Sequence, residues 1–166
     1  MNKSFTPDMT QHHAGGIEID APGRSPLPPL KKKRSVHILC IDDDACVRAF
    51  MTQCLTHFNH RVMVASGGKH GLELFRAASL ENQPYEVVIT DLGMPDIDGQ
   101  RVARAIKAES PNTPVIMMTG WGTFMENDRE TPLQVDAVVG KPTRMQELND
   151  LVLRITAPAA TPSCPP

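Results

Sequence analysis

The sequence has few aromatic residues and no long apolar run. Only 4% of its 166 residues are aromatic, including a single Trp and a single Tyr. No segment approaches the roughly 18 consecutive apolar residues that a membrane-spanning helix needs. The first residues, MNKSFTPDMTQHHAGG, lack the apolar centre of a secretory signal peptide. We therefore expect a cytoplasmic protein without a membrane segment.

Cysteines are also few, and their spacing suits neither zinc nor a disulfide framework. The four cysteines are Cys40, Cys46, Cys54 and Cys164, and no two of them form a CxxC pair. Zinc sites usually contain such pairs, and disulfide frameworks are typical of short secreted chains with dense cysteines. The pattern fits a reducing compartment.

Prolines concentrate at the two ends of the chain. Nine of the fifteen lie before Ser35 or after Ile155. We predict a disordered, Pro-rich and basic N-terminal segment at 1–34, one domain at 35–156, and a disordered Pro-rich tail at 157–166. A separate domain usually needs about 100 residues, so neither end is expected to form an output domain.

Charge divides along the same boundary. Residues 1–34 contain six basic and three acidic residues, whereas the rest contains eleven basic and sixteen acidic residues, a net charge of −5. An acidic domain is a poor nucleic-acid binder. The basic run at 31–34 is short, and we interpret it as a solvated linker end. We therefore do not expect a nucleic-acid partner.

From residue 36 onward, short apolar runs alternate with helical periodicity. Strands are predicted at 36–41, 61–65, 86–90, 115–118 and 135–139. Helices are predicted between them and after the last strand, including at most a short fourth helix within 123–134. This alternation predicts an α/β fold, a doubly wound five-stranded parallel sheet with flanking helices.

The sequence also predicts details of three of these helices. Asp44 can cap the first helix, whose predicted apolar face is Val47, Phe50, Met51, Cys54, Leu55 and Phe58. Gly71 is expected to weaken the second helix. Thr143 and Gln146 have the spacing of a capping box at the start of the last helix.

Polar side chains follow four of the predicted strands where each strand ends. Asp42, Asp43 and Asp44 follow the first strand, Asp91 the third, Thr119 the fourth and Lys141 the fifth. Ligands of open parallel sheets bind beyond the carboxyl ends of the strands, so these groups should line one crevice. Neighbouring carboxylates repel unless a cation joins them, and oxygen ligands alone select Mg²⁺ or Mn²⁺.

These residues occur in four motifs. They are Ile38-Leu39-Cys40-Ile41-Asp42-Asp43-Asp44, Val87-Val88-Ile89-Thr90-Asp91-Leu92-Gly93-Met94-Pro95, Met118-Thr119-Gly120 and Gly140-Lys141-Pro142. Over residues 35–156 the sequence resembles the receiver domain of two-component response regulators, of a single-domain type similar to the receivers of hybrid histidine kinases. The resemblance implies the flavodoxin-like strand order 2-1-3-4-5.

The resemblance also implies roles for the site residues. Asp91 would be the phosphoacceptor, receiving a phosphoryl group from a histidine kinase or phosphotransfer protein. Asp43, Asp91 and the Gly93 carbonyl would bind Mg²⁺, with Asp42 assisting through water. Lys141 would pair with the phosphoryl group, and Thr119 would be the hydroxyl that moves toward it. The bond between Lys141 and Pro142 is expected to be cis.

Two positions complicate this interpretation. Many receivers have an aromatic residue three positions before the lysine, but this sequence has Val138, which puts the coupling from Thr119 in doubt. Trp121, the only tryptophan, either anchors its loop or shields the phosphoryl group from water.

Three other functions fit parts of this sequence. A Mg²⁺-dependent phosphohydrolase with an aspartyl-phosphate intermediate is the main alternative, but it usually needs a general acid two residues after its nucleophile, where this sequence has Gly93. A receiver used only as a binding scaffold would not need all the acids, Thr119 and Lys141. A DNA-binding regulator would need a helix-turn-helix. We favour a signalling domain that is not a turnover enzyme and whose phosphorylated state is read by a partner chain.

Overall fold

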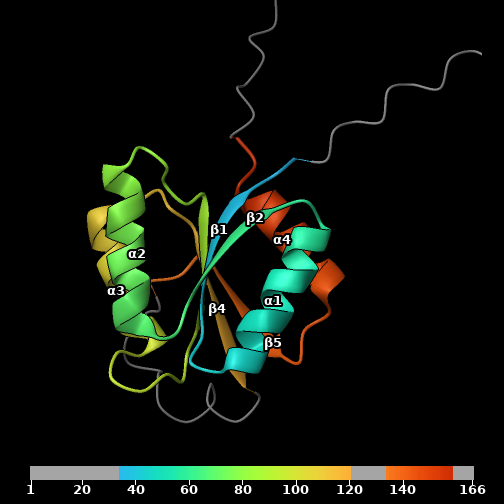
Figure 1. Cartoon of the computed structure of the whole chain (residues 1–166), viewed down its shortest axis with the longest axis horizontal. Helices are drawn as coiled ribbons and strands as arrows, with labels where there is room; N and C mark the ends of the chain where they lie inside the picture. Colours follow the sequence, from blue (N-terminus) through green and yellow to red (C-terminus); the bar gives the residue numbers. More distant parts are fainter. Residues whose placement is uncertain (1–33, 121–133, 159–166) are drawn as a thin grey trace, which may run out of the picture. The chain divides into compact units, whose positions relative to one another are not determined.

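The computed structural model describes residues 34–120 and 134–158 (Figure 1). All of these residues belong to one compact unit. Its first five elements are β1 (His37–Ile41), α1 (Ala45–His57), β2 (Arg61–Ala65), α2 (Gly68–Leu80) and β3 (Val87–Asp91). The remaining four are α3 (Gly99–Glu109), β4 (Val115–Gly120), β5 (Ala137–Lys141) and α4 (Met145–Ile155).

The strands form one parallel sheet in the order β2-β1-β3-β4-β5. The predicted fold class and strand order are therefore confirmed. The register pairs Ile38 of β1 with Val87 of β3 and Thr119 of β4 with Gly140 of β5. Because all strands run the same way, their carboxyl ends meet at one edge of the sheet.

Helices cover both faces of the sheet (Figure 1). On one face, α2 and α3 pack against a buried cluster that includes Leu39, Ile41 and Met117. On the other, α1 and α4 pack against a cluster that includes Ile38, Cys40 and Ile116. Successive residues of a strand point to opposite faces, so an almost continuous apolar strand such as β1 supplies both clusters.

The helix starts follow local sequence in two cases and not in a third. Asp44 caps α1 as predicted, with its side chain accepting hydrogen bonds from the main-chain N–H groups of Cys46 and Val47. Asp98 caps α3 in the same manner. The predicted capping box at Thr143 is wrong: the N-cap of α4 is Arg144, which makes no side-chain capping bond.

The last strand begins later than predicted. The apolar pattern suggested 135–139, whereas β5 covers Ala137–Lys141. Val135 is only partly buried and packs against the cluster beside α2 and α3 without joining the strand. Asp136 instead holds the start of β5, because its carboxylate accepts the Val115 N–H at 2.8 Å and lies 2.6 Å from Lys107 Nζ.

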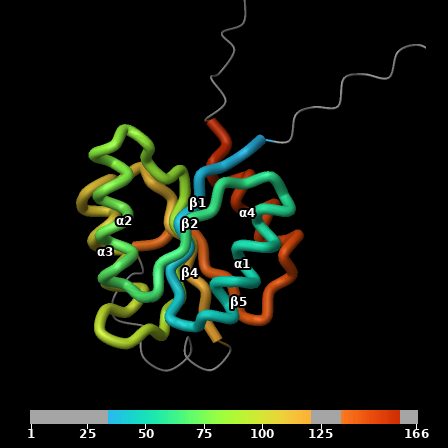
Figure 2. Tube along the Cα trace, viewed as in Figure 1, coloured from blue at the N-terminus to red at the C-terminus, as the bar shows by residue number. Residues whose placement is uncertain are grey.

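The two ends of the described domain emerge on the same side (Figure 2). Arg34 joins them: its guanidinium donates to the main-chain oxygen of Thr156 and lies 2.7 Å from Glu86 Oε2. The proline and charge pattern places Arg34 in the tail, but its side chain contacts the domain. None of the helices found within 34–120 and 134–158 is long and apolar enough to cross a membrane.

Several predictions lie outside the described residues. These concern the disordered segments predicted at 1–34 and 157–166, of which residues 34, 157 and 158 are described, the short helix predicted within 123–134, of which only residue 134 is described, and the position of Trp121.

Candidate functional site

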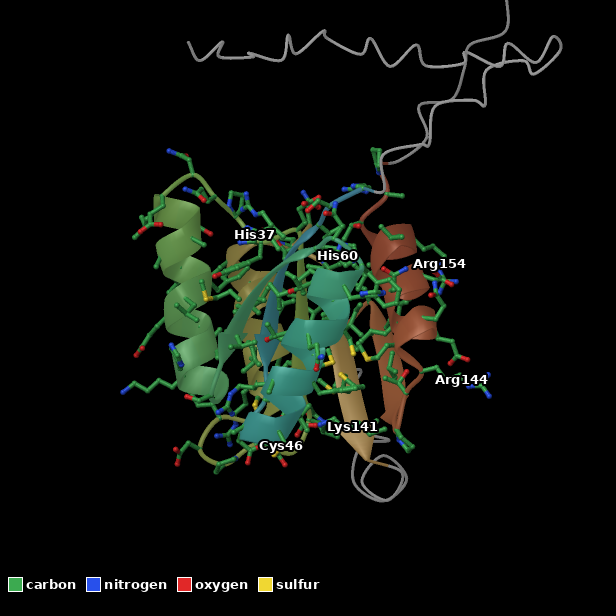
Figure 3. All side chains as sticks on the ribbon, turned by 45° about the vertical axis from the view of Figure 1, so that its right-hand side comes forward. His37, Cys46, His60, Lys141, Arg144 and Arg154 are labelled. Carbon is green, nitrogen blue, oxygen red and sulfur yellow. The ribbon has the colours of Figure 1, made fainter. Side chains whose placement is uncertain are left out.

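The polar residues predicted to converge lie at the carboxyl edge of the sheet. Asp42 directly follows β1, Asp91 is the last residue of β3, and Lys141 is the last residue of β5. Figure 3 shows Lys141 at the end of the domain opposite His37, the first residue of β1. The topology thus brings together residues that are up to 99 positions apart in the sequence.

Lys141 bridges the two carboxylates. Its Nζ lies 2.6 Å from Asp91 Oδ1 and 2.8 Å from Asp42 Oδ2. To reach them the side chain must pass the end of β4, where its register partner is Gly120, a residue without a side chain. The side chains of Asp42 and Asp91 are only 8% and 12% exposed, so solvent screens this arrangement weakly.

The ion pairs keep the lysine charged. Burial opposes the charge, but hydrogen bonds and Coulombic attraction from Asp42 and Asp91 outweigh it, so the pKa of Lys141 is raised. Both carboxylates therefore already share one cation. The bond from Lys141 to Pro142 is cis, as predicted.

Each carboxylate is also held by a nearby main-chain N–H group. Asp42 Oδ1 accepts the N–H of Asp44 at 2.9 Å, and Asp91 Oδ2 accepts the N–H of Gly93 at 2.9 Å. These bonds fix the orientation of the two carboxylates. In the described part of the domain, every buried side-chain nitrogen or oxygen has a hydrogen-bond partner.

Asp43 and Asp44 do not join the carboxylate pair. Asp44 caps α1, and Asp43 is exposed, with no ion pair to another described residue. Within 34–120 and 134–158, no group of three or more acidic, His or Cys side chains surrounds one point as a metal site would. The carboxylates of Asp42 and Asp91 are hard oxygen ligands of the kind that Mg²⁺ prefers, and in this structure the ammonium of Lys141 is the cation that pairs with them.

Thr119 lies next to this pair but is not bonded to it. It is buried in β4, and its hydroxyl donates to the main-chain oxygen of Gly120 at 3.1 Å. Met118, its neighbour, is the register partner of Asp91.

Two residues that support the site were not singled out from the sequence. Arg48 of α1 donates from Nη1 to the main-chain oxygen of Asp42 at 2.8 Å. At Gly99, a Cβ atom would lie 2.2 Å from the carbonyl oxygen of Asp91, so only glycine fits beside the end of β3. Neither contact has a signal in the local sequence: the spacing of Asp44 and Arg48 suits an ion pair between their side chains, whereas Arg48 bonds the main chain of Asp42.

Val138, which stands where many receivers have an aromatic residue, lies in β5, an edge strand of the sheet. The residue is 40% exposed. A valine at this position presents a small apolar surface and no ring that could swing between buried and exposed rotamers.

Comparison with known families identifies this arrangement. The family model described as "Response regulator receiver domain" matches residues 38–153, which contain the whole carboxylate edge. The chain belongs to this family. Receiver domains are the phosphoacceptor signalling domains of two-component systems and are not classical enzymes, which leaves the phosphohydrolase alternative without support.

The relatives are regulators of greater length. The probable transcriptional regulator ycf27 of Porphyra purpurea is 35% identical over 113 residues, covering 67% of this chain and 43% of the relative. The transcriptional regulatory protein TcrA of Mycobacterium tuberculosis is 27% identical over 126 residues, covering 76% and 48%. The transcription factor SKN7 of Saccharomyces cerevisiae is 28% identical, covering 74% and 19%. This receiver thus spans less than half the length of these relatives.

Solved structures show the same fold. A response regulator receiver domain protein from Clostridium thermocellum is 28% identical with a TM-score of 0.63, covering 72% of this chain and 92% of that one. The response regulator protein TrrA from Thermotoga maritima, solved in complex with Mg²⁺ and BeF, is 24% identical with a TM-score of 0.61 and covers 71% and 96%.

Proposed function

We propose that Asp91 accepts a phosphoryl group from the phosphohistidine of a histidine kinase or phosphotransfer protein, with Mg²⁺ assistance. The observation that carries this proposal is the pairing of a nearly buried Asp91 with Lys141 at 2.6 Å, beside Asp42. A carboxylate next to a fixed cation can attack phosphorus while the cation balances the negative charge that the phosphoryl group brings.

The transfer itself is a displacement at phosphorus. A carboxylate oxygen of Asp91 forms the new O–P bond as the N–P bond of the phosphohistidine breaks. The donor imidazole keeps the electron pair of that bond and takes a proton from solvent. Lys141 would then pair with a phosphoryl oxygen, and Thr119 would turn its hydroxyl from Gly120 toward another.

Magnesium would be held by Asp43, Asp91 and the carbonyl of Gly93, with Asp42 acting through water. Its charge would reduce the repulsion between the carboxylate and the incoming phosphoryl oxygens. Asp42 is held at the carboxyl edge of the sheet because the N–H of Asp44 bonds one of its carboxylate oxygens and the ammonium of Lys141 bonds the other.

The surface beside the pair supports a protein donor. A groove of about 290 Å³ has an almost wholly apolar lining that includes Val47, Phe50, Met51, Met118, Pro142 and Met145, and Lys141 also lines it. Phe50 is 52% exposed. A donor that places its imidazole at Asp91 would cover this groove, and burying its apolar side chains would stabilise the complex.

The output would depend on another chain or segment. The relatives named above are transcriptional regulators, but the region they share with this chain is the receiver. We propose that the phosphorylated receiver is read by a downstream protein and that slow loss of the phosphoryl group to water ends the signal. The net charge of −5 outside residues 1–34 does not favour direct DNA binding by the receiver.

Transfer from a protein donor tests the proposal. The receiver is mixed with a panel of ³²P-labelled phosphotransfer domains and Mg²⁺, and label on the receiver is followed over time. We expect at least one donor to transfer label to wild type and none to transfer label to Asp91→Asn. Transfer from the protein donor to Phe50→Ser should be slower than to wild type. Phe50→Ser should still react with acetyl phosphate at the wild-type rate. Labelling of Asp91→Asn at the wild-type rate would refute the proposal.

A further inference from the structure

Arg48 makes an unusual contact for a basic residue near the start of a helix. It lies in the first turn of α1, where the partial positive charge of the helix dipole opposes another cation. Its side chain turns back over the helix start, the direction in which helical side chains lean, and Nη1 donates to the main-chain oxygen of Asp42 at 2.8 Å. The side chain is partly buried there.

That oxygen belongs to the peptide group that joins Asp42 to Asp43. The Asp42 side chain has its own supports, namely the N–H of Asp44 and the ammonium of Lys141. Asp43 is exposed and has no ion pair with any described side chain, so its position depends on the main chain that carries it. The bond from Arg48 fixes one side of this peptide, and the Asp42 N–H fixes the main chain before it by donating to Ala65 at 3.2 Å.

We propose that Arg48 is a positioning residue for the Mg²⁺ site, holding the Asp42–Asp43 peptide so that the carboxylate of Asp43 faces the carboxyl edge of the sheet. The inference rests on the proposed function, because it concerns the cation that assists Asp91. Arg48 supplies no ligand and touches no reacting atom.

The charge of Arg48 and its hydrogen bond to Asp42 would change the affinity for Mg²⁺ in opposite directions, so a variant can distinguish the two effects. As a nearby positive charge, the guanidinium repels Mg²⁺, so its removal would tighten cation binding. As a positioning group, it holds a ligand in place, so its removal would weaken binding. Residues that orient metal ligands typically contribute about 10- to 100-fold to metal affinity.

The test is calorimetric titration of Mg²⁺ into the unphosphorylated full chain. Arg48→Met keeps the apolar stem without donor or charge, and Arg48→Lys keeps both a donor and a charge. Arg104→Met removes a positive charge from the exposed face of α3, where the one bond of Arg104 to another described residue is to Gln100 at 3.4 Å. Thermal melting of each variant in EDTA reports whether the domain still folds.

We expect Arg48→Met to raise the Kd for Mg²⁺ by about tenfold, Arg48→Lys to recover most of the loss, and Arg104→Met to match wild type. Equal or tighter binding by Arg48→Met would overturn the proposal, as would failure of Arg48→Lys to recover affinity while its melting temperature in EDTA is that of wild type. If wild type binds no Mg²⁺, the proposed cation itself fails and this inference fails with it. If wild type and Arg48→Met bind Mg²⁺ with the same Kd, only the inference fails.

Discussion

Lys141 Nζ lies 2.6 Å from Oδ1 of Asp91, although the two residues lie on strands separated by β4. The lysine thus ties β1 and β3 to the edge strand β5, because it also bonds Asp42 after β1. In this state its ammonium neutralises part of the carboxylate charge that Mg²⁺ would otherwise balance, and the same ammonium would be the partner of an anionic phosphoryl group on Asp91. We therefore expect Lys141 to contribute both to the stability of the fold and to phosphoryl transfer.

Replacing Lys141 with Met should destabilise the domain when no divalent cation is present. Breaking a buried ion pair by removing one partner costs about 3–5 kcal/mol. The lysine side chain is 28% exposed, so we expect somewhat less. Urea unfolding in EDTA measures the loss. Adding Mg²⁺ should raise the melting temperature of Lys141→Met more than that of wild type, because a bound cation stabilises only the folded state.

Lys69→Met is the matched control, since Lys69 is an exposed lysine in the first turn of α2. It should unfold within about 0.5 kcal/mol of wild type, as most surface substitutions do. If Lys141→Met and Lys69→Met were equally stable in EDTA, the two ion pairs would contribute nothing to the fold.

Gly99→Ala should disrupt the end of β3. A Cβ at Gly99 would lie 2.2 Å from the carbonyl oxygen of Asp91, so the backbone at Asp91 would have to move. Overpacking of this kind costs typically about 1–3 kcal/mol. We also expect slower phosphorylation of Asp91, since phosphoryl transfer depends on close positioning.

Gly93→Ala provides the comparison for Gly99→Ala. A Cβ at Gly93 would lie 3.7 Å from Asp91 Oδ2, an ordinary contact. Denaturant unfolding of both variants should show a loss for Gly99→Ala only. A loss of equal size in both would mean that the close approach at Gly99 is not the cause.

Alkaline conditions should destabilise the fold partly through Cys40. Burial, with a smaller contribution from Asp42, raises the pKa of the Cys40 thiol from 9.0 to about 12. Below pH 9 the thiol is protonated in both states, so this contribution to stability is fully present. As the pH rises from 9 towards 12, the unfolded chain loses the proton first, and stability falls by up to about 4 kcal/mol.

Cys40→Ala should remove that part of the pH dependence. Urea midpoints of wild type, Cys40→Ala and Cys54→Ala would be compared between pH 8 and pH 11. Cys54 is less buried and serves as the control. Parallel decreases in all three proteins would show that ionisation of Cys40 does not contribute.

The sheet and the principal site residues could be predicted because each has a local signal. Apolar runs that end in polar residues mark the strands, and parallel strands place those polar residues at one edge. The pairing of Asp42 and Asp91 with Lys141 follows from that rule. The capping role of Asp44 could also be predicted, because capping depends on the residues next to it in the sequence.

Features that depend on tertiary neighbours could not be predicted in the same way. Phe50 fits the periodic face of α1 but is 52% exposed, because the buried stripe of this helix consists of Met51 and Leu55. Helix propensity marked Gly71 as a weakness, yet a Cβ there would lie 2.4 Å from Ile41 Cδ1, so glycine lets α2 pack closely on β1. Periodicity and propensity contain no information about such distances.

Phosphorylation at Asp91 tests the central claim most directly. Wild type and Asp91→Asn, each with Mg²⁺, are incubated with acetyl phosphate, and intact mass and peptide mapping locate any adduct. Asp91→Asn keeps the size of the side chain but removes the nucleophilic carboxylate. We predict one acid-stable, base-labile phosphoryl group on Asp91 of wild type and none on Asp91→Asn. No adduct on wild type, or an equal adduct on both proteins, would contradict the assignment of Asp91 as the phosphoacceptor.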